Sequence, residues 1–372
     1  MLDIQFIRQN IDLAVALLKK RGMDFDKERF YELENSRKEI QTQCESFQNK
    51  KNSIAKQIGQ AKVKGESIDE LLNEASGLPV KIDELNSKLS NILNEINHWL
   101  ESLPNFPHED VPVGENEESN IEIRKYGQIP KFDFNPKDHV EIGINLGLDF
   151  ETAAMLSGSR FAFLKGPAAR LHRALVQYML DFQTLKNDYQ ECYTPYIVNR
   201  KTLFGTGQLP KFEEDLFSVR KGGSEDAQES LFLIPTSEVS LTNLAANKIF
   251  TESDLPLKFT AHTPCFRSEA GSYGQDTKGL IRQHQFDKVE MVQIVSPEDS
   301  DSVLDIMVTN AEDILKSLGL AYRVILLSTG DMGFSASKTF DLEVWLPVGC
   351  ALRCDSKIKK QMFRMELLIS GV

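Results

Sequence analysis

Hydrophobic residues recur in alternating steps of three and four over much of the N-terminal part of the chain. One series covers residues 30–61, stops at the sequence KVKGES, and is followed by a second over residues 68–99. This spacing is typical of the a and d positions of a coiled coil, and a glycine-containing turn between two such series favours an antiparallel hairpin. The pattern therefore predicts a long helical arm that buries little beyond its own seam, with a kink at Gly77 and Pro79.

The chain changes character after this arm. Residues 103–135 gather prolines, glycines and acids, which is typical of a linker. The sequence LHRALVQYMLDFQTLKNDY then predicts an amphipathic helix from Leu171 to about Tyr189, followed by the short strand ECYTPYIV. Later segments alternate apolar and polar positions with a period of two. We therefore expect an α+β fold, in which the arm precedes a largely antiparallel sheet flanked by helices.

The stretch FRSEAGSYGQDTKGLIRQHQFDKVEM predicts two antiparallel strands around a glycine-bearing loop. Side chains two apart share a strand face, so Arg267 and Glu269 lie on one face, as do Phe286, Lys288 and Glu290 on the returning strand. An exposed ladder of salt bridges is one interpretation. A nucleotide site is the other, because arginine forks bind phosphate, phenyl rings stack on bases, and a glycine loop can close over a polyanion.

A second polar group follows an apolar strand in LFLIPTSEVSLTNLAANKI. Thr236 or Ser237 could simply cap the next helix, with Glu238 favourable in its first turn. Beside the ionic hairpin, however, a hydroxyl and a carboxylate at a strand end also form a pocket for an ammonium group. Cationic side chains that can bind phosphate would then lie next to a carboxylate that can bind ammonium. This combination indicates an amino acid and a nucleotide as substrates.

Composition narrows the possible partners. The net charge of −12 and a pI near 5.2 argue against a generic nucleic-acid binder. The stretch between residues 50 and 65 nevertheless carries only basic charges and falls at the predicted tip of the arm. A solvated helix end and a phosphate-contacting finger both remain open for this cluster, which comprises Lys50, Lys51, Lys56, Lys62 and Lys64.

Several other classes of protein are disfavoured by missing motifs. The five cysteines are odd in number and scattered, so we expect reduced thiols. The chain contains neither a C-x-x-C nor an H-E-x-x-H motif, so we expect no zinc. No apolar stretch approaches the roughly 18 residues of a membrane helix, and the N-terminus lacks a signal-peptide pattern, so we expect a cytoplasmic protein with no membrane partner. Phosphate-binding P-loop, dinucleotide and serine-elbow motifs are also missing.

These motifs together resemble one family. FRSE, the loop and IRQHQFDKVEM are similar to motif 2 of the class II aminoacyl-tRNA synthetases, and IPTSE resembles the T-x-E element of the seryl-tRNA synthetases. SGSRFAFLKGPAARLHRAL, GDMGFSASKTFDLEVWLP and the N-terminal hairpin resemble further segments of that family, up to about residue 347. The resemblance implies a serine–tRNA ligase that uses ATP and Mg²⁺ to activate L-serine, then transfers it to tRNA(Ser) and also to tRNA(Sec).

The resemblance also implies residue roles and an assembly. Its ATP-binding residues are Arg267, Ser268, Glu269, Arg282 and Phe286: Arg267 would hold the α-phosphate as the catalytic group, Glu269 would orient adenine, Arg282 would reach the γ-phosphate and Phe286 would stack on adenine. Its serine-binding residues are Thr236, Ser237, Glu238, Arg267 and Glu290, and its tRNA contacts are the five lysines of the tip. A homodimer would form through the helix from Leu171 and the strand ending at Pro195.

The sequence departs from the family after EVWLP. The expected Y-x-E-I-x-S strand and motif 3 do not follow, and residues 348–372 resemble the product of a truncated or frameshifted gene. We therefore expect little aminoacylation by this chain alone, and the alternatives are a catalytically impaired synthetase or a non-catalytic tRNA-binding relative. A plain coiled-coil scaffold would explain residues 27–100 only. The expected domains are a tRNA-binding arm at 1–102, a linker at 103–135, an incomplete catalytic core at 136–347 and an aberrant tail at 348–372.

Overall fold

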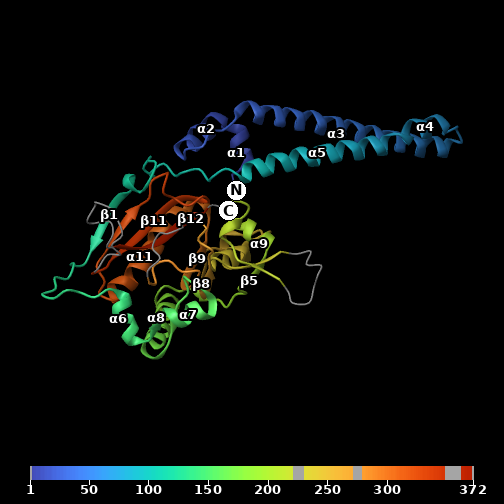
Figure 1. Cartoon of the computed structure of the whole chain (residues 1–372). Helices are drawn as coiled ribbons and strands as arrows, with labels where there is room; N and C mark the ends of the chain where they lie inside the picture. The colour runs from blue at the N-terminus through green and yellow to red at the C-terminus, as the bar shows by residue number, and fades with distance from the viewer. Residues whose placement is uncertain (1, 221–229, 271–278, 348–361, 371–372) are drawn as a thin grey trace. The chain divides into compact units, whose positions relative to one another are not determined.

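The computed structural model describes residues 2–220, 230–270, 279–347 and 362–370 (Figure 1). The chain divides into two compact units, Met1–Pro104 and Asn105–Val372. Each unit builds its own core.

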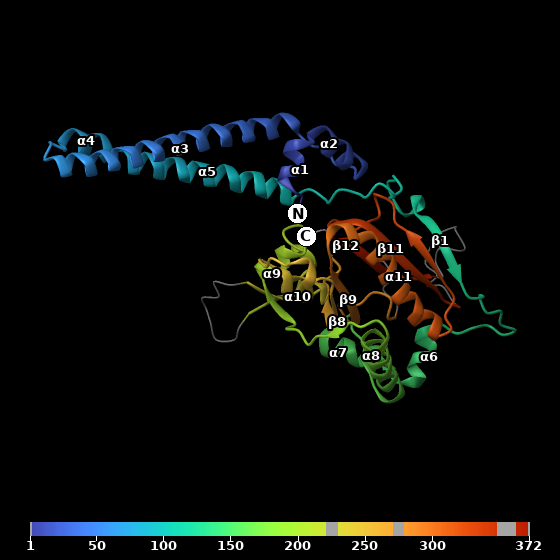
Figure 2. The same cartoon turned by 180° about the vertical axis from the view of Figure 1, so that it is seen from behind.

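The first unit is a helical hairpin preceded by two short helices. Helix α3 spans 38 residues, which at 1.5 Å per residue gives a rod of about 57 Å, and α5 runs alongside it in both views (Figures 1 and 2). The helices of this unit are α1 (Ile4–Gln9), α2 (Ile11–Lys20), α3 (Lys27–Lys64), α4 (Asp69–Ser76) and α5 (Leu78–Glu101).

Helices α3 and α5 meet along the predicted a/d seam. Ile54 and Ala61 of α3 and Ile82 and Ile96 of α5 are buried, and the flanking positions are exposed. α3 ends at Gly65, whose φ of +75° is a left-handed conformation that glycine adopts without strain. The predicted helical arm is therefore confirmed. The predicted kink is an interruption at Gly77 that separates α4 from α5.

The second unit contains an antiparallel sheet in the order β1-β10-β11-β12. Its strands are β1 (Ile121–Tyr126), β10 (Tyr322–Leu326), β11 (Ala336–Trp345) and β12 (Met362–Ser370). Helix α11 (Ser300–Ser317) lies against one face of this sheet (Figure 2). Together they bury a core of Leu304, Val308, Ala311, Leu315, Tyr322, Val324, Leu326, Phe340 and Leu342.

Two strands of this sheet fall in segments for which the sequence predicted no strand. β1 lies within the predicted linker, and it pairs with β10 although all six of its residues are exposed. β12 lies within the predicted aberrant tail and pairs with β11 from Met362↔Trp345 to Ser370↔Ala336. Backbone hydrogen bonds to a neighbouring strand, rather than a buried face, hold β1 in the sheet, which is why its pattern gave little signal.

A second sheet carries the ionic hairpin. β8 (Leu257–Phe266) and β9 (Gln285–Ile294) pair antiparallel along their whole length, and β4 (Gln190–Glu191) adds to β8 in parallel. Helix α8 (Gly166–Lys186) packs on this sheet and begins five residues before the predicted start at Leu171. The long antiparallel pairing and the flanking helices confirm the predicted α+β fold class.

Smaller elements complete the unit. β5 (Ile197–Asn199), β7 (Leu231–Leu233) and β6 (Ser218–Val219) form a three-stranded sheet that leads into α10 (Glu238–Thr242). The others are α6 (His139–Leu146), β2 (Leu148–Asp149), α7 (Phe150–Ser157), β3 (Phe163–Leu164), α9 (Arg200–Gly205) and the 3-10 turns Glu117–Ser119, Glu213–Asp215, Asn243–Ala245, Glu252–Asp254 and Pro297–Asp299. Among the described helices, none combines the length and the apolar character needed to cross a membrane.

Candidate functional site

The end of the β8–β9 hairpin that carries the connecting loop gathers most of the predicted site residues. The register pairs Cys265 with Phe286 and Ala261 with Glu290. Alternate residues of β9 point to the same side, so Phe286, Lys288 and Glu290 share a face of the hairpin. Gly271 and Gly274 of the predicted loop lie outside the described residues.

The first strand ends earlier than the sequence suggested. β8 stops at Phe266, so Arg267 and Glu269 both follow the strand, and Glu269 has a φ of +54°. The expectation that these two side chains share a strand face is therefore wrong. The reason is a competing set of hydrogen bonds, because Ser268 N donates to Asp215 O at 2.9 Å and Ala270 N to Asp215 Oδ1 at 3.0 Å.

The carboxylate of Glu290 is the centre of a polar cluster. Thr236 Oγ1 donates to Glu290 Oε2 in a short hydrogen bond, and Ser237 Oγ donates to the same oxygen at 3.2 Å. The backbone N–H of Glu238 reaches it at 3.3 Å, and Lys288 Nζ lies 2.8 Å away. All four contacts fall on Oε2. The T-S-E segment and β9, which are about fifty residues apart in sequence, thus converge on one oxygen atom.

The contacts of this cluster bear on the two interpretations of the T-S-E segment. Ser237 stands at the N-cap of α10, but its side chain makes no capping hydrogen bond. Its hydroxyl is directed to Glu290 instead. The hydroxyl of Thr236 donates to Glu290 as well, although its oxygen also accepts from Glu238 N, the first N–H of α10, at 3.3 Å; Ser237 and Thr236 are 0% and 3% exposed. Burying two hydroxyls against a carboxylate is more than a helix cap needs, and it favours a binding site.

Electrostatics keep Glu290 ionised. Burial by itself raises the pKa of its carboxyl, but the charge of Lys288 and the hydrogen bonds from Lys288, Thr236 and Ser237 outweigh it, so the pKa lies below its ordinary value. A largely buried carboxylate that is ionised near neutral pH is suited to hold an ammonium group.

Arg267 lies beside this cluster on the hairpin side. Its Nε donates to Pro235 O at 3.3 Å, and its guanidinium carbon lies 5.3 Å from the centre of the Phe286 ring. The residue is exposed. A planar cation, held by one hydrogen bond and one ring and open to solvent, is available to a phosphate oxygen.

Glu269 and Arg282 form an ion pair. Arg282 Nη1 donates to Glu269 Oε2 at 2.7 Å, and both side chains are partly buried. Ser268, the remaining predicted ATP residue, donates its hydroxyl to Glu214 O at 2.6 Å. The contacts of Ser268, together with the ion pair, fix the backbone just past β8.

Two residues of this region were not assigned a role from the sequence. The sequence predicts that Lys288 lies on the ionic face of the returning strand. Its spacing of two from Glu290 is the signal that could have indicated their contact. Asp215 anchors the chain after β8, but it comes from a distant segment and no local pattern connects it with Ser268 or Ala270.

The predicted tRNA-contacting lysines all lie on the arm. Lys50 pairs with Glu74 of α4 through a 2.7 Å ion pair, with both side chains about half exposed. Lys51, Lys56, Lys62 and Lys64 are exposed along the last turns of α3. The cluster therefore presents its charge to solvent.

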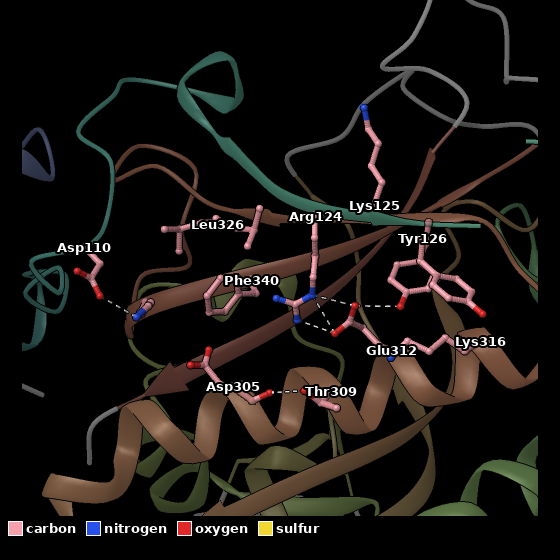
Figure 3. Close-up of a pocket in the computed structure, with 13 residues that line it drawn as sticks. Asp110, Arg124, Lys125, Tyr126, Asp305, Thr309, Glu312, Lys316, Leu326 and Phe340 are labelled. Carbon is pink, nitrogen blue, oxygen red and sulfur yellow. Dashed lines mark hydrogen bonds and ion pairs between the residues drawn. The ribbon is translucent and has the colours of Figure 1, made fainter. Parts of the chain in front are cut away.

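A groove of about 720 Å³ lies between β1 and α11 (Figure 3). Its buried acid, Glu312, accepts from Arg124 at two nitrogens and from the hydroxyl of Tyr322 at 2.9 Å. Burial raises the pKa of Glu312, but these donors bring it below its ordinary value. Of the predicted site residues that the structure describes, none lines this groove. Arg124 neutralises the buried acid of this groove, so the hairpin cluster around Glu290 remains the candidate site.

Comparisons with known proteins identify the family of this chain. Residues 1–107 match the seryl-tRNA synthetase N-terminal domain, and residues 217–367 match the tRNA synthetase class II core domain (G, H, P, S and T). The chain is 57% identical over 348 residues to the serine–tRNA ligase of Methylobacillus flagellatus and 55% identical over 347 residues to that of Herminiimonas arsenicoxydans. Each alignment covers 93% of this chain, and 81% and 80% of the respective relative.

Solved structures give the same result. A crystal structure of seryl-tRNA synthetase from Pyrococcus horikoshii complexed with ATP superposes with a TM-score of 0.82 at 34% identity, covering 93% of this chain and 81% of that one. The cytoplasmic serine–tRNA ligase of Naegleria fowleri in complex with AMP also has a TM-score of 0.82, at 26% identity, covering 98% of this chain and 84% of that one.

Proposed function

This chain belongs to the seryl-tRNA synthetase family of class II serine–tRNA ligases, and we propose that its hairpin pocket activates L-serine with ATP. In the first step the serine carboxylate attacks the α-phosphate, seryl-adenylate forms and pyrophosphate leaves. In the second, a terminal ribose hydroxyl of tRNA(Ser) attacks the carbonyl carbon of seryl-adenylate, the ester to the tRNA forms, and AMP leaves. Neither step needs a side-chain nucleophile, so positioning and charge stabilisation supply the catalysis.

The observation that carries this proposal is the convergence on Glu290. A buried, ionised carboxylate with two buried hydroxyls beside it is complementary to the ammonium and hydroxyl groups of serine. We assign the ammonium of serine to Thr236 and Glu238, and we propose that Glu290 accepts from the ammonium or from the hydroxyl of serine. Ser237 would hold the Glu290 carboxylate in place. Alanine would leave part of this polar set unpaired, which gives a physical basis for its rejection.

Arg267 provides the phosphate side of the pocket. We propose that it holds the α-phosphate and stabilises the charge that develops there, because its exposed guanidinium lies next to the serine cluster. Phe286 would stack on adenine through the ring face that Arg267 leaves free. Glu269 would orient adenine and Arg282 would reach the γ-phosphate, which requires their ion pair to open when ATP binds.

Magnesium belongs to the same proposal. Among the residues that the structure describes, no cluster of three His, Cys, Asp or Glu side chains is placed to hold a metal. An Mg²⁺ ion that bridges ATP phosphates takes most of its ligands from phosphate and water, so it fits a pocket with few protein ligands. Bound in this way, it would neutralise phosphate charge and help orient the leaving pyrophosphate.

The proposal extends to the RNA and to the assembly. The lysines of the arm would contact the phosphates of tRNA(Ser) and, by the same contacts, of tRNA(Sec), in the cytoplasm. A homodimer would form through α8 and the segment after it. Leu171, Leu185 and Tyr193 are 55%, 82% and 90% exposed there, and a second copy would remove these apolar side chains from water.

Two assays test the proposal. Purified protein should catalyse detectable serine-dependent exchange of pyrophosphate into ATP and charge tRNA(Ser) with serine, both at the low level that the departure from the family pattern after EVWLP predicts. L-alanine in place of L-serine is the matched control. Exchange that is independent of the added amino acid would contradict the proposal. Binding of tRNA(Ser) with no exchange would favour the alternative, a catalytically impaired or non-catalytic relative.

A further inference from the structure

Lys288 places a cation where the proposed function expects the ammonium group of the substrate. Its Nζ lies 2.8 Å from Glu290 Oε2 and 2.7 Å from Thr236 Oγ1. Those two oxygens are among the acceptors proposed above for the α-ammonium of serine. The ammonium of lysine and that of an amino acid carry the same charge and the same three donors. The protein therefore fills the ammonium position with a side chain of its own.

We infer that Lys288 is a placeholder that neutralises Glu290 in the empty pocket and that the ammonium of serine displaces it on binding. The inference rests on the proposed function, because it takes serine as the displacing ligand. It assigns Lys288 as a positioning residue that sets the charge of Glu290 and the selectivity of the pocket for a cationic group.

The burial of the pocket explains why a placeholder is needed. Thr236 and Ser237 are almost completely buried, and the side chain of Glu290 is 17% exposed. Hydroxyl and backbone N–H donors solvate a carboxylate but bring no charge, and an unpaired buried charge is strongly unfavourable. Arg267 is engaged elsewhere, since its Nε is bound to Pro235 O and its guanidinium lies against Phe286. Lys288 is thus the cation in direct contact with Glu290.

The same surroundings allow Lys288 to leave. Its side chain is 31% exposed, and its flexible four-carbon stem can carry the ammonium into solvent without moving β9. The contacts to Glu290 all fall on Oε2, and no described residue donates to Oε1. Serine can therefore begin to bind at Oε1 before Lys288 is released, so the carboxylate never lacks a partner.

The other ionisable groups around Glu290 do not replace Lys288. They are Cys265 of β8, Arg267 just after it, and Glu238 at the start of α10. Burial raises the pKa of the Cys265 thiol, so this group stays uncharged near neutral pH. Glu238 is acidic and cannot neutralise a second carboxylate. Removal of Lys288 should therefore raise the pKa of Glu290 and let it take up a proton as the pH falls.

The test is calorimetric titration with L-serine at about pH 6 and about pH 8.5, with a non-hydrolysable ATP analogue in every sample. The variants are Lys288→Ala, Lys288→Met and Lys288→Arg. Lys258→Ala is the matched control, because Lys258 lies on the same hairpin and donates only to Asn187 O at 3.5 Å. Thermal unfolding checks that each variant is folded, and Lys288→Met keeps the volume of the stem if the alanine variant does not fold.

The placeholder role predicts a specific pattern. At about pH 8.5 the alanine and methionine variants should bind serine as tightly as wild type or up to about fivefold more tightly, because no internal cation competes. The ratio of Kd at pH 6 to Kd at pH 8.5 should rise about tenfold over the wild-type ratio, since a protonated Glu290 no longer attracts ammonium. Lys288→Arg and Lys258→Ala should keep the wild-type ratio.

Two results would overturn the inference in different ways. Equal weakening of serine binding at both pH values, with wild type binding normally, would show that Lys288 holds the substrate or the fold, and the inference alone would fail. Absence of serine binding by wild type at either pH would refute the proposed function, and the placeholder role would fail with it.

Discussion

The arm and the hairpin pocket each bury a glutamate, and they neutralise it in different ways. In the arm, Glu34 is 3% exposed and takes hydrogen bonds on both oxygens, including 2.7 Å from Arg8 Nη2 and 3.1 Å from Arg37 Nη2. In the pocket, Glu290 takes its contacts on Oε2 from two hydroxyls, a backbone N–H and Lys288. Burial raises the pKa of each carboxyl, and its partners bring each pKa below the ordinary value.

The difference separates a structural charge from a binding charge. Two planar guanidinium groups occupy both oxygens of Glu34 and hold it in a fixed geometry, which suits a permanent contact between α1 and α3. Glu290 depends on a single flexible ammonium and keeps one oxygen without a described donor. A carboxylate with both oxygens bound to arginine stabilises the fold. A carboxylate whose single cationic partner can be displaced can bind a ligand.

Replacing Glu34 should have the largest effect, on stability alone. Glu34→Ala leaves Arg8 and Arg37 without their acceptor, and loss of one partner of a buried ion pair costs about 3 kcal/mol. The free energy of unfolding of the arm should fall by that amount, as measured by chemical denaturation. Serine-dependent pyrophosphate exchange should stay within about twofold of wild type. A loss of exchange in the folded variant would show that Glu34 also serves catalysis and is not a purely structural charge.

Replacing Arg267 should have the largest effect on chemistry. Arg267→Ala removes the cation proposed for the α-phosphate, and loss of one such preorganised group lowers kcat about 10²-fold. Pyrophosphate exchange measures this effect. Arg200→Ala is the matched control, because Arg200 forms an exposed pair with Glu213 in the same unit. An equal loss in both variants would indicate a general electrostatic effect instead of a specific one.

Replacing Glu290 should affect serine more than ATP. Glu290→Gln keeps the shape but removes the charge that pairs with ammonium, a loss of about 2 kcal/mol or roughly thirtyfold in kcat/KM for serine. The KM for ATP should change little, and thermal stability should fall less than in Glu34→Ala. Steady-state exchange at varied serine and ATP concentrations separates these effects. A change confined to the KM for ATP would contradict this prediction, because it would show that Glu290 binds ATP and not serine.

The lysines of the tip should affect only the RNA step. Substituting Lys62 and Lys64 together with alanine should raise the KM for tRNA(Ser) severalfold and reduce its salt dependence by about one unit of slope per lost phosphate contact. Exchange, which needs no tRNA, should be unchanged. Lys20→Ala, at the end of α2, is the control. An unchanged KM for tRNA would leave the lysines as a solvated helix end.

The smallest effect concerns pH. Because the folded-state pKa of Glu34 lies below its unfolded value, its contribution is complete above the unfolded pKa and is lost as the pH falls through the folded one. Wild type should therefore lose stability below about pH 4.5 more steeply than Glu34→Gln, by at most about 1.4 kcal/mol per unit of pKa difference. Denaturation midpoints measured between pH 3 and pH 6 test this. Parallel curves for the two proteins would contradict it.

The sequence alone was sufficient for features that depend on local periodicity. The three-and-four spacing located both long helices of the arm, because a coiled-coil seam is a repeating contact that each turn of helix encodes. The period of two and the motif resemblance located the ionic hairpin and its family. The helix interruption at Gly77 followed from the backbone properties of glycine and proline.

Only the tertiary structure decided which groups meet, because that depends on contacts between distant segments. It ended β8 before Arg267 through Asp215, and it placed β1 and β12 in a sheet without a strong local signal. It also directed the hydroxyls of Thr236 and Ser237 onto Glu290, and it placed Lys288 there as the counter-ion. A side chain's partner is fixed by the free energy of burying its charge, and that depends on neighbours that no local pattern in the sequence specifies.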